Sequence, residues 1–161
     1  FYLSGRFATL SITTITSEFI QSALDELHEQ NSTLGLKPGA MISIGFQTFL
    51  PNLMNYTHTA AYSLFASSTL VLPVFFQFSW TNASDDNDFV DAIRLSRNNL
   101  YQAALDQGQT INGSQQIQYP NYALDDAPLS QIYGSNLARL RSIRKAWDPN
   151  NIMYLTGGFK L

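Results

Sequence analysis

The longest apolar run of the chain is "STLVLPVFFQFSW", residues 68 to 80. It contains Pro73 and Gln77, and it is too short and too rich in β-branched and aromatic residues to predict a membrane span. Such a run, followed by a polar, turn-rich stretch, is typical of a buried β-strand. We therefore expect a strand ending at Trp80, and the rest of the fold follows from what can pack beside it.

Two other stretches predict strands that could pair with this one. Residues 7–15, "FATLSITTI", are apolar and β-branched, and residues 41–49, "MISIGFQTF", alternate between two faces. The alternation places Gln47 on the same face as Met41 and Phe49. Residues 51–68 have no clean period, so we expect irregular structure there.

Apolar periodicity predicts three helices. The first begins with Ser17 as N-cap and Glu18 in its first turn, and ends near Asn31. Its expected buried stripe is Phe19, Ile20, Ala23, Leu24 and Leu27. The second follows the acidic stretch "TNASDDND" and runs to about Gln107, with an apolar face of Phe89, Ile93, Leu100 and Ala104.

A polar stretch at 108–118, "GQTINGSQQIQ", is expected to be a surface loop. The third helix is predicted over residues 128–147, and Asp148 and Pro149 stop it. Its expected apolar stripe is Leu137, Leu140, Ile143 and Trp147.

This order of elements predicts an α+β fold, an antiparallel sheet covered on one face by helices. Three strands make a small sheet, so we expect at least one of them to pair with sequence outside this chain. The chain begins without methionine or a signal peptide, which suggests that it is a piece of a longer protein.

The composition excludes some functions and favours others. With 161 residues, 13% charged residues and a net charge of −3, the chain has little attraction for nucleic acid, and no membrane span is expected. There is no cysteine. Four glycosylation sequons exceed the roughly two expected by chance, which favours secretion. They begin at Asn31, Asn55, Asn82 and Asn112.

Several catalytic patterns are missing from the sequence. His28 and His58 lack zinc-site spacing, so no metal is expected. The acidic "DDNDFVD" lacks the turn glycine and terminal glutamate of a calcium loop and suits a helix start. The basic "ARLRSIRK" suits a solvated helix end. Neither a nucleophile elbow nor a glycine-rich phosphate loop is present, so hydrolase and kinase functions are not supported.

The stretch "YPNY", residues 119–122, is unusual because it places large rings in a polar, turn-rich segment. Pro120 favours an extended Tyr119, so we expect a strand-like piece with Tyr119 and Tyr122 on opposite faces. Gln47 and Gln77 are polar groups on otherwise apolar strands. Each either faces solvent or lines a pocket.

The run "YPNYALDDAPLSQIYGSNLARLRSIRKAWDPNNIMYLTGGFKL", residues 119–161, resembles the C-terminal signature of the berberine-bridge-enzyme-like FAD-linked oxidases. In that family Tyr-x-Asn-Tyr is followed by Tyr-Gly-x-Asn, an Arg-Leu pair and Asp-Pro-x-Asn. The matching residues here are Tyr119, Asn121, Tyr122, Tyr133, Gly134, Asn136, Arg139, Leu140, Asp148, Pro149 and either Asn150 or Asn151. The closing "LTGGFKL" is similar to the fungal branch.

The resemblance implies two parts of a longer enzyme. Residues 1–118 would be part of the substrate-binding domain. Residues 119–161 would be a tail and helix that return to an N-terminal FAD-binding portion, which is absent from this chain. FAD would be bound mainly by that portion, and oxygen would accept its electrons.

The resemblance also assigns roles to residues. Tyr122 matches the tyrosine that serves as catalytic base, and Tyr119 and Asn121 match positions against the flavin. Gln47, Phe75 and Gln77 are the candidate substrate-binding residues. A free phenol, with a pKa near 10, is a poor base at neutrality, so such a base needs a group that lowers its pKa.

Some members of the family use a glutamate on the sheet instead, and "VLPVFFQFSW" has no carboxylate, which argues against their cyclisation chemistry. The substrate class stays open among alcohols, sugars and secondary metabolites. The alternative function is a freestanding binding or interaction module without redox activity.

Overall fold

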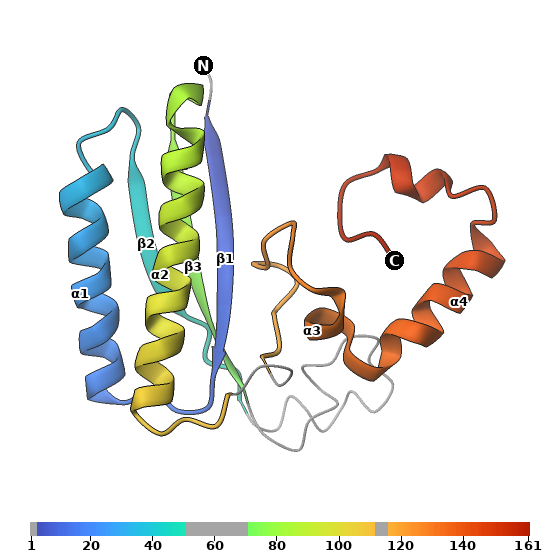
Figure 1. Cartoon of the computed structure of the whole chain (residues 1–161), viewed down its shortest axis with the longest axis horizontal. Coiled ribbons are helices and arrows are strands. Elements are labelled where there is room, and N and C mark those ends of the chain that lie inside the picture. The colour runs from blue at the N-terminus through green and yellow to red at the C-terminus, as the bar shows by residue number, and fades with distance from the viewer. Residues whose placement is uncertain (1–2, 51–70, 112–115) are drawn as a thin grey trace.

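The computed structural model describes residues 3–50, 71–111 and 116–161. Its sheet consists of β1 (Ser4–Ile12), β2 (Met41–Phe46) and β3 (Leu72–Trp80) in the order β1-β3-β2, with both neighbours antiparallel to β3. Helices α1 (Ser17–Leu34) and α2 (Asp86–Asp106) cover one face (Figure 1). The predicted α+β fold is confirmed. The irregular structure expected for 51–68 lies outside the described residues.

Strand β3 is the centre of the sheet and alternates between its two faces. Val74, Phe76, Phe78 and Trp80 are fully buried under the helices, whereas Phe75 and Gln77 lie on the opposite face. Trp80 stacks on Phe89 of α2, with ring centroids 4.7 Å apart and planes 9° apart. Its Nε1 donates a hydrogen bond of 2.5 Å to Asp86 Oδ1. The strand therefore carries the largest side chains of the core.

The helix predicted at Ser17 forms, but its cap and its buried face differ from the prediction. Thr16 is the N-cap, and its hydroxyl accepts a hydrogen bond of 3.0 Å from the Phe19 amide. Helix α1 is turned toward α2 by a polar contact, because Glu26 is buried and accepts hydrogen bonds from Gln30 and from Asn99 of α2. The prediction that Ile20 and Leu24 are buried was wrong, since they are 41% and 53% exposed.

The described residues of the segment expected to be a surface loop are instead packed against the end of β1. Gln109, Gln116 and Gln118 are buried. Gln109 Oε1 accepts a hydrogen bond of 2.9 Å from the Thr13 amide, and Gln116 Nε2 donates one of 3.2 Å to the Ser11 carbonyl. The polar sequence was wrongly interpreted as a sign of solvent exposure. Glutamine side-chain amides can hydrogen-bond to the backbone groups that a buried loop leaves unpaired, so such a segment can be both polar and buried.

The other predicted elements have shifted ends. β1 begins and ends three residues earlier than expected, and β2 ends at Phe46 rather than at Phe49. α2 follows a short 3-10 turn, η3 (Ala83–Asp85), and buries the predicted apolar face.

The helix predicted over residues 128–147 is broken near its start. It consists of α3 (Leu129–Tyr133), the 3-10 turn η5 (Gly134–Asn136) and α4 (Leu137–Trp147), followed by the 3-10 turn η6 (Ile152–Leu155). Gly134 has a φ of 51°, in the left-handed region that ends a regular helix and favours glycine. No helix among the described residues is long and apolar enough to cross a membrane.

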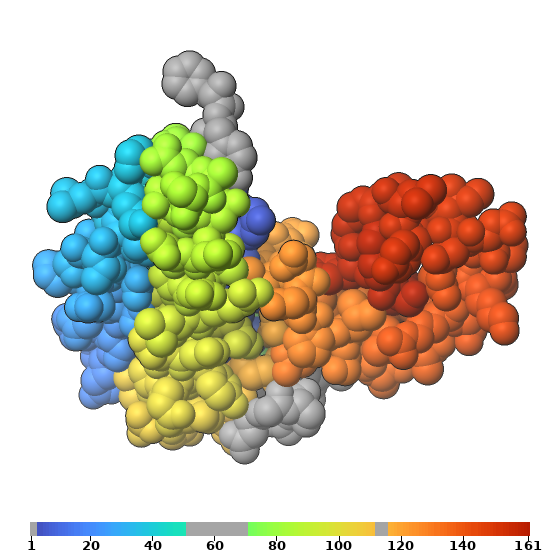
Figure 2. All heavy atoms as spheres, turned by 45° about the horizontal axis from the view of Figure 1, so that its top comes forward, coloured from blue at the N-terminus to red at the C-terminus, as the bar shows by residue number. Residues whose placement is uncertain are grey.

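The elements from α4 onward form an arm that projects from the sheet (Figure 1), and Figure 2 shows this arm as a separate lobe. The predicted apolar stripe of α4 is not buried within the described chain. Leu137 and Leu140 are half-buried, and Ile143 and Trp147 are exposed.

Candidate functional site

The face of the sheet that points away from α1 and α2 carries the candidate site. The register places Phe75 of β3 between Thr9 and Gly45, and Gln77 between Phe7 and Ser43. We call this the open face. The segment from Tyr119 to Tyr122 lies against it, through ring contacts with Phe7 and Phe75.

The segment "YPNY" forms a turn rather than the extended piece that we expected. The amides of Tyr122 and Ala123 both donate hydrogen bonds of 3.0 Å to the Tyr119 carbonyl. Pro120 occupies the second position of this turn, where its fixed φ is favourable. The prediction that Tyr119 and Tyr122 point to opposite faces was therefore wrong. Their ring centroids are 5.3 Å apart, with an interplanar angle of 66°.

Tyr122 is held by two phenylalanines of the open face. Its ring stacks on Phe7 at a centroid distance of 5.6 Å and lies 5.2 Å from Phe75. Its hydroxyl donates a hydrogen bond of 3.3 Å to Oε1 of Gln47, which directly follows β2. Ring contacts with β1 and β3, and a hydrogen bond to the residue after β2, give this phenol a defined position over the sheet.

Tyr119 and Asn121 form the outer part of the same cluster. The Tyr119 ring packs edge-on against Phe49, with centroids 5.6 Å apart. Asn121 Nδ2 donates a hydrogen bond of 2.8 Å to the Tyr119 hydroxyl. Asn121 is exposed, so the remaining hydrogen-bonding groups of its amide face outward.

Gly45 makes room for the Phe75 ring beneath Tyr122. A Cβ atom at residue 45 would lie 2.3 Å from Phe75 Cζ, closer than such atoms approach in proteins. The absence of a side chain here therefore allows the Phe75 ring to lie over the neighbouring strand.

We predict that Gly45→Ala displaces the Phe75 ring and changes the near-ultraviolet circular dichroism of the tyrosines, because Phe75 contacts Tyr122. The far-ultraviolet spectrum should stay unchanged. Gly157→Ala is the matched control, since nothing lies within 4 Å of the added atom. Equal near-ultraviolet spectra for both variants would contradict the packing described here.

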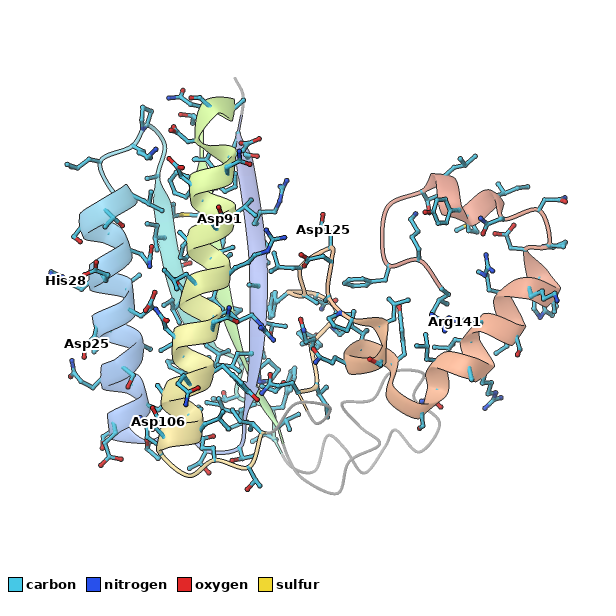
Figure 3. All side chains as sticks on the ribbon, in the orientation of Figure 1. Asp25, His28, Asp91, Asp106, Asp125 and Arg141 are labelled. Carbon is cyan, nitrogen blue, oxygen red and sulfur yellow. The ribbon has the colours of Figure 1, made fainter. Side chains whose placement is uncertain are left out.

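A cavity of about 440 Å³ adjoins the cluster. It lies between the start of β1, the turn and the end of the chain. Its lining includes Arg6, Phe7, Asn121, Asp125 and Phe159. Figure 3 shows Asp125 on the loop beside β1. The cavity thus offers aromatic surface, an amide and charges of both signs next to the Tyr122 ring.

Five of the six residues predicted for the catalytic, cofactor and substrate sites are joined by contacts in this cluster: Gln47, Phe75, Tyr119, Asn121 and Tyr122. The sixth, Gln77, lies on the same face of β3 as Phe75. Phe7, Phe49 and Gly45 were missed. Phe7 could have been found, because alternation along residues 7–15 places it opposite the buried Ala8 and Leu10. Gly45 carries no signal of its own in a sequence.

Other candidates lie away from the open face. Asn31 and Asn82 are exposed, in α1 and directly before η3, whereas Asn55 and Asn112 lie outside the described residues. His28 projects outward from α1 (Figure 3) and His58 is not described. Within the described ranges, no three His, Cys, Asp or Glu side chains are grouped so that they could hold a metal ion.

The Asp-Pro-x-Asn motif folds the end of the arm. Asp148 accepts hydrogen bonds of 2.7 and 2.9 Å from the amides of Ile152 and Met153, which caps η6. Asn151, with a φ of 56°, accepts a hydrogen bond through its side chain from Arg144 of α4. The sequence did not decide whether Asn150 or Asn151 is the last residue of the motif. The hydrogen bond from Arg144 favours Asn151.

Residues 118–157 match the family described as "Berberine and berberine like". The C-terminal segment is similar to a berberine-like domain. The matched range contains the Tyr-x-Asn-Tyr turn, α3, α4 and the Asp148 cap, so the resemblance to the berberine-bridge-like FAD-linked oxidases is confirmed. The comparisons with curated proteins and with solved structures gave no match.

The berberine-like domain belongs to FAD-linked oxidoreductases, and the family is FAD-dependent in general. In this chain the domain begins where the segment beside β1 ends, and its first turn supplies the two tyrosines that cover the open face. The domain therefore supplies the phenols, and the sheet supplies the surface on which they rest.

Proposed function

We propose that this chain is the C-terminal substrate-domain portion of a secreted FAD-dependent oxidoreductase. The enzyme oxidises an alcohol, sugar or secondary metabolite by hydride transfer to flavin, with oxygen as the final acceptor. Residues 1–118 form part of the substrate-binding domain. Residues 119–161 pack on an N-terminal FAD-binding portion of the same protein.

The observation that carries this proposal is the position of Tyr122. Its hydroxyl lies over an aromatic face, and among the described residues its hydrogen-bond partner is Gln47. A tyrosine held in this position can, as its phenolate, take a proton from a bound hydroxyl group. Gln47 can support both states of the phenol, because its amide has an oxygen that accepts from the hydroxyl and hydrogens that can face a phenolate.

The residues around the turn suit the ring of a flavin. Asn121 and Tyr119 offer an amide and a phenol, which match the polar edge of such a ring, and Phe7 offers aromatic surface beside the cavity. The phosphates of FAD need a cradle of backbone amides, and the described part of the chain has no glycine-rich loop that opens a helix. The described part of the chain therefore offers contacts for the flavin ring of FAD but no cradle for its phosphates.

When bound, FAD supplies the oxidant that accepts a hydride from the substrate carbon. In the proposed step, the phenolate oxygen of Tyr122 takes the proton of the substrate hydroxyl as the carbonyl forms. Gln47 orients Tyr122, and the Phe7 and Phe75 rings fix its plane and keep water from one side of it. Phe75 and Gln77 contact the substrate from the sheet.

The exposed apolar residues of the arm support a partner surface on the absent FAD-binding portion. Ile143, Trp147, Met153 and Leu155 are exposed within one projecting segment. A run of exposed large side chains of this kind marks an interaction site. We assign it to the N-terminal portion of the same protein.

Secretion and a fungal origin are the finer parts of the proposal. Exposed sequons at Asn31 and Asn82 support glycosylation, and the end "LTGGFKL" is similar to the fungal branch. Mass spectrometry of the protein from culture medium tests both sequons. Absence of the protein from the medium contradicts secretion without affecting the assigned chemistry.

The test of the function is flavin reduction by candidate substrates in the full-length protein. Primary alcohols, sugars and phenolic metabolites are mixed with it without oxygen, and the loss of flavin absorbance is followed. One of these classes should bleach the flavin, and admission of oxygen should restore the colour with release of hydrogen peroxide. A yellow protein that no class bleaches would contradict the oxidase.

We predict that the isolated 161-residue chain binds no FAD, because the phosphates and adenine find no amide cradle on it. The purified chain should be colourless, and added FAD should pass through dialysis. The full-length protein is the control and should be yellow. A stoichiometric flavin band in the isolated chain would contradict the assignment of the phosphate site to the absent portion.

A further inference from the structure

The two tyrosines of the candidate site lie on a loop that is closed at its base. The Gln118 amide donates a hydrogen bond of 2.9 Å to the Gln131 carbonyl, and Gln118 Nε2 donates one of 2.6 Å to Gln131 Oε1. We call residues 118–131 the tyrosine loop. Because its ends are held together, the position of Tyr122 depends on how the closed loop is oriented on the sheet.

The tyrosine loop contains two turns in succession. The first turn, residues 119–122, ends at Tyr122. In the second, the Ala127 amide donates a hydrogen bond of 3.0 Å to the Leu124 carbonyl, and Asp126 occupies its third position. One residue separates the two turns, so a rotation of the second is passed on to the first.

The tyrosine loop contacts the rest of the protein on both sides of β1, which it follows in Figure 1. The Tyr122 ring stacks on Phe7 on the open face. Asp126 Oδ2 accepts a hydrogen bond of 2.6 Å from Nη2 of Arg94, which belongs to α2 on the other face. An anchor on each side of the strand opposes rotation of the loop about its base.

Helix α2 gives Arg94 a fixed position relative to the open face. About one turn further along, Arg97 Nε donates a hydrogen bond of 2.9 Å to the Thr9 carbonyl of β1. Burial lowers the pKa of the Arg97 guanidinium, as expected for a side chain enclosed between a helix and a strand. Thr9 pairs with Phe75, whose ring contacts Tyr122. The ion pair therefore ties the loop to the same unit on which the phenol rests.

Close packing does not hold the tyrosine loop on the α2 side. A cavity of about 230 Å³ lies between the helix and the loop, and its lining includes Arg94, Arg97, Leu124 and Asp126. Side chains that line a cavity lack the close contacts of a packed interior. The Arg94–Asp126 pair joins the two sides of this cavity, and thus supplies a directional contact where packing is incomplete.

The contacts of Tyr122 on the open face tolerate little rotation of the loop. Its hydrogen bond to Gln47, at 3.3 Å, is already longer than usual for a hydroxyl donor. The stacking contact with Phe7 has no such directional requirement. A tilt of the loop would therefore break the hydrogen bond first and move the hydroxyl away from Gln47.

We propose that Arg94 and Asp126 are positioning residues for Tyr122, and that their ion pair orients the tyrosine loop for catalysis. The inference rests on the role proposed above for Tyr122. Both residues act from the far side of β1, through the loop rather than on the substrate. Their side chains are 40% and 59% exposed, and exposed ion pairs contribute little to folding stability. Positioning can therefore be measured apart from stability.

Asp126→Asn in the full-length protein tests the proposal. Flavin reduction by substrate should slow about tenfold or more, because a displacement of about 1 Å can cost about 100-fold in rate. Flavin content and Tm should stay at the parent values. Asp88→Asn is the matched control, since Asp88 pairs with Lys37 at the same 2.6 Å and is 57% exposed. Equal reduction rates in the two variants overturn the proposal.

Charge reversal provides a second test. Arg94→Glu and Asp126→Arg each place two like charges together, so each alone should slow flavin reduction at least as much as Asp126→Asn. The double variant restores opposite charges and should recover most of the parent rate. A double variant that is no faster than the single variants overturns the proposal.

Hydrogen exchange of residues 118–131 in the full-length protein reports on the loop without reference to catalysis. Asp126→Asn should speed exchange of the Tyr122 and Ala123 amides, which donate to the Tyr119 carbonyl, because a loop that loses an anchor opens more often. Asp88→Asn should not. Unchanged exchange in Asp126→Asn overturns the positioning role, whereas a Tyr122→Phe variant that reduces flavin at the parent rate contradicts the proposed function itself.

Discussion

Replacing Tyr122 with phenylalanine in the proposed full-length oxidase is expected to lower kcat by about 10²- to 10⁴-fold, the usual loss when a general base is removed. The flavin content and the Tm should stay at the parent values. The ring keeps its contacts with Phe7 and Phe75, so the substitution removes only the hydroxyl and its hydrogen bond to Gln47.

The decisive measurement is the rate of flavin reduction by substrate across pH in a stopped-flow instrument. The variant should reduce flavin slowly and should lose the ionisation that the parent shows, because no phenolate can form at residue 122 to accept the proton. If Tyr122→Phe reduces flavin at the parent rate with the same pH profile, Tyr122 is a packing residue. A structural tyrosine would instead lower the Tm and leave kcat almost unchanged.

Tyr119→Phe is the matched control for this prediction. The Tyr119 hydroxyl accepts a hydrogen bond from the Asn121 amide, and the Tyr119 ring packs on Phe49. Loss of this hydroxyl therefore disturbs the outer part of the cluster. A smaller decrease in kcat is expected than for Tyr122→Phe. Equal losses in both variants would indicate that the pair acts as one unit rather than through a single base.

The largest effect on stability is expected for Trp80→Ala in the isolated chain. The substitution should lower the free energy of unfolding by about 3–5 kcal/mol, the range for aromatic residues truncated to alanine in cores. Trp80 is fully buried, stacks on Phe89 and donates to Asp86. Because whole domains are stable by only about 5–15 kcal/mol, the variant should be largely unfolded on mild heating.

Urea unfolding followed by circular dichroism at a fixed chain concentration measures this change. Trp147→Ala is the control, because the second tryptophan of the chain is 87% exposed and its truncation should shift the midpoint little. Trp80→Phe separates the contributions, since it keeps a ring against Phe89 but removes the donor to Asp86. Similar midpoints for Trp80→Ala and Trp147→Ala would show that β3 does not form the core.

The sequence predicted the strands and the α+β class. Its longest apolar run was interpreted as a buried strand ending at Trp80, and every second residue from Val74 to Trp80 is buried under the helices. The helix period alone did not tell which side of α1 is buried, because Glu26 and Gln30 are polar residues that form a contact with α2. Pairing between buried polar groups is a tertiary property and leaves no periodic signal.

The candidate site was predicted as a set of residues but not as a geometry. Gln47 and Tyr122 were both identified, yet nothing in the sequence says that they share a hydrogen bond across 75 positions. Pro120 was taken as a sign of extension because it restricts the residue before it, whereas its own φ also suits a turn. Local rules of this kind allow both an extended segment and a turn. The contacts of the tyrosines with the aromatic face beneath them favour the turn.

The order β1-β3-β2 has a consequence for how the chain folds during synthesis. Among the described residues, β1 and β2 pair with β3 and not with each other, since Ser4 pairs with Trp80 and Met41 with Ser79. This part of the sheet therefore cannot form until β3 has left the ribosome. Until then the apolar residues of β1 and β2 lack these pairing partners, so slow translation of residues 47–80 would lengthen the interval in which they are open to aggregation.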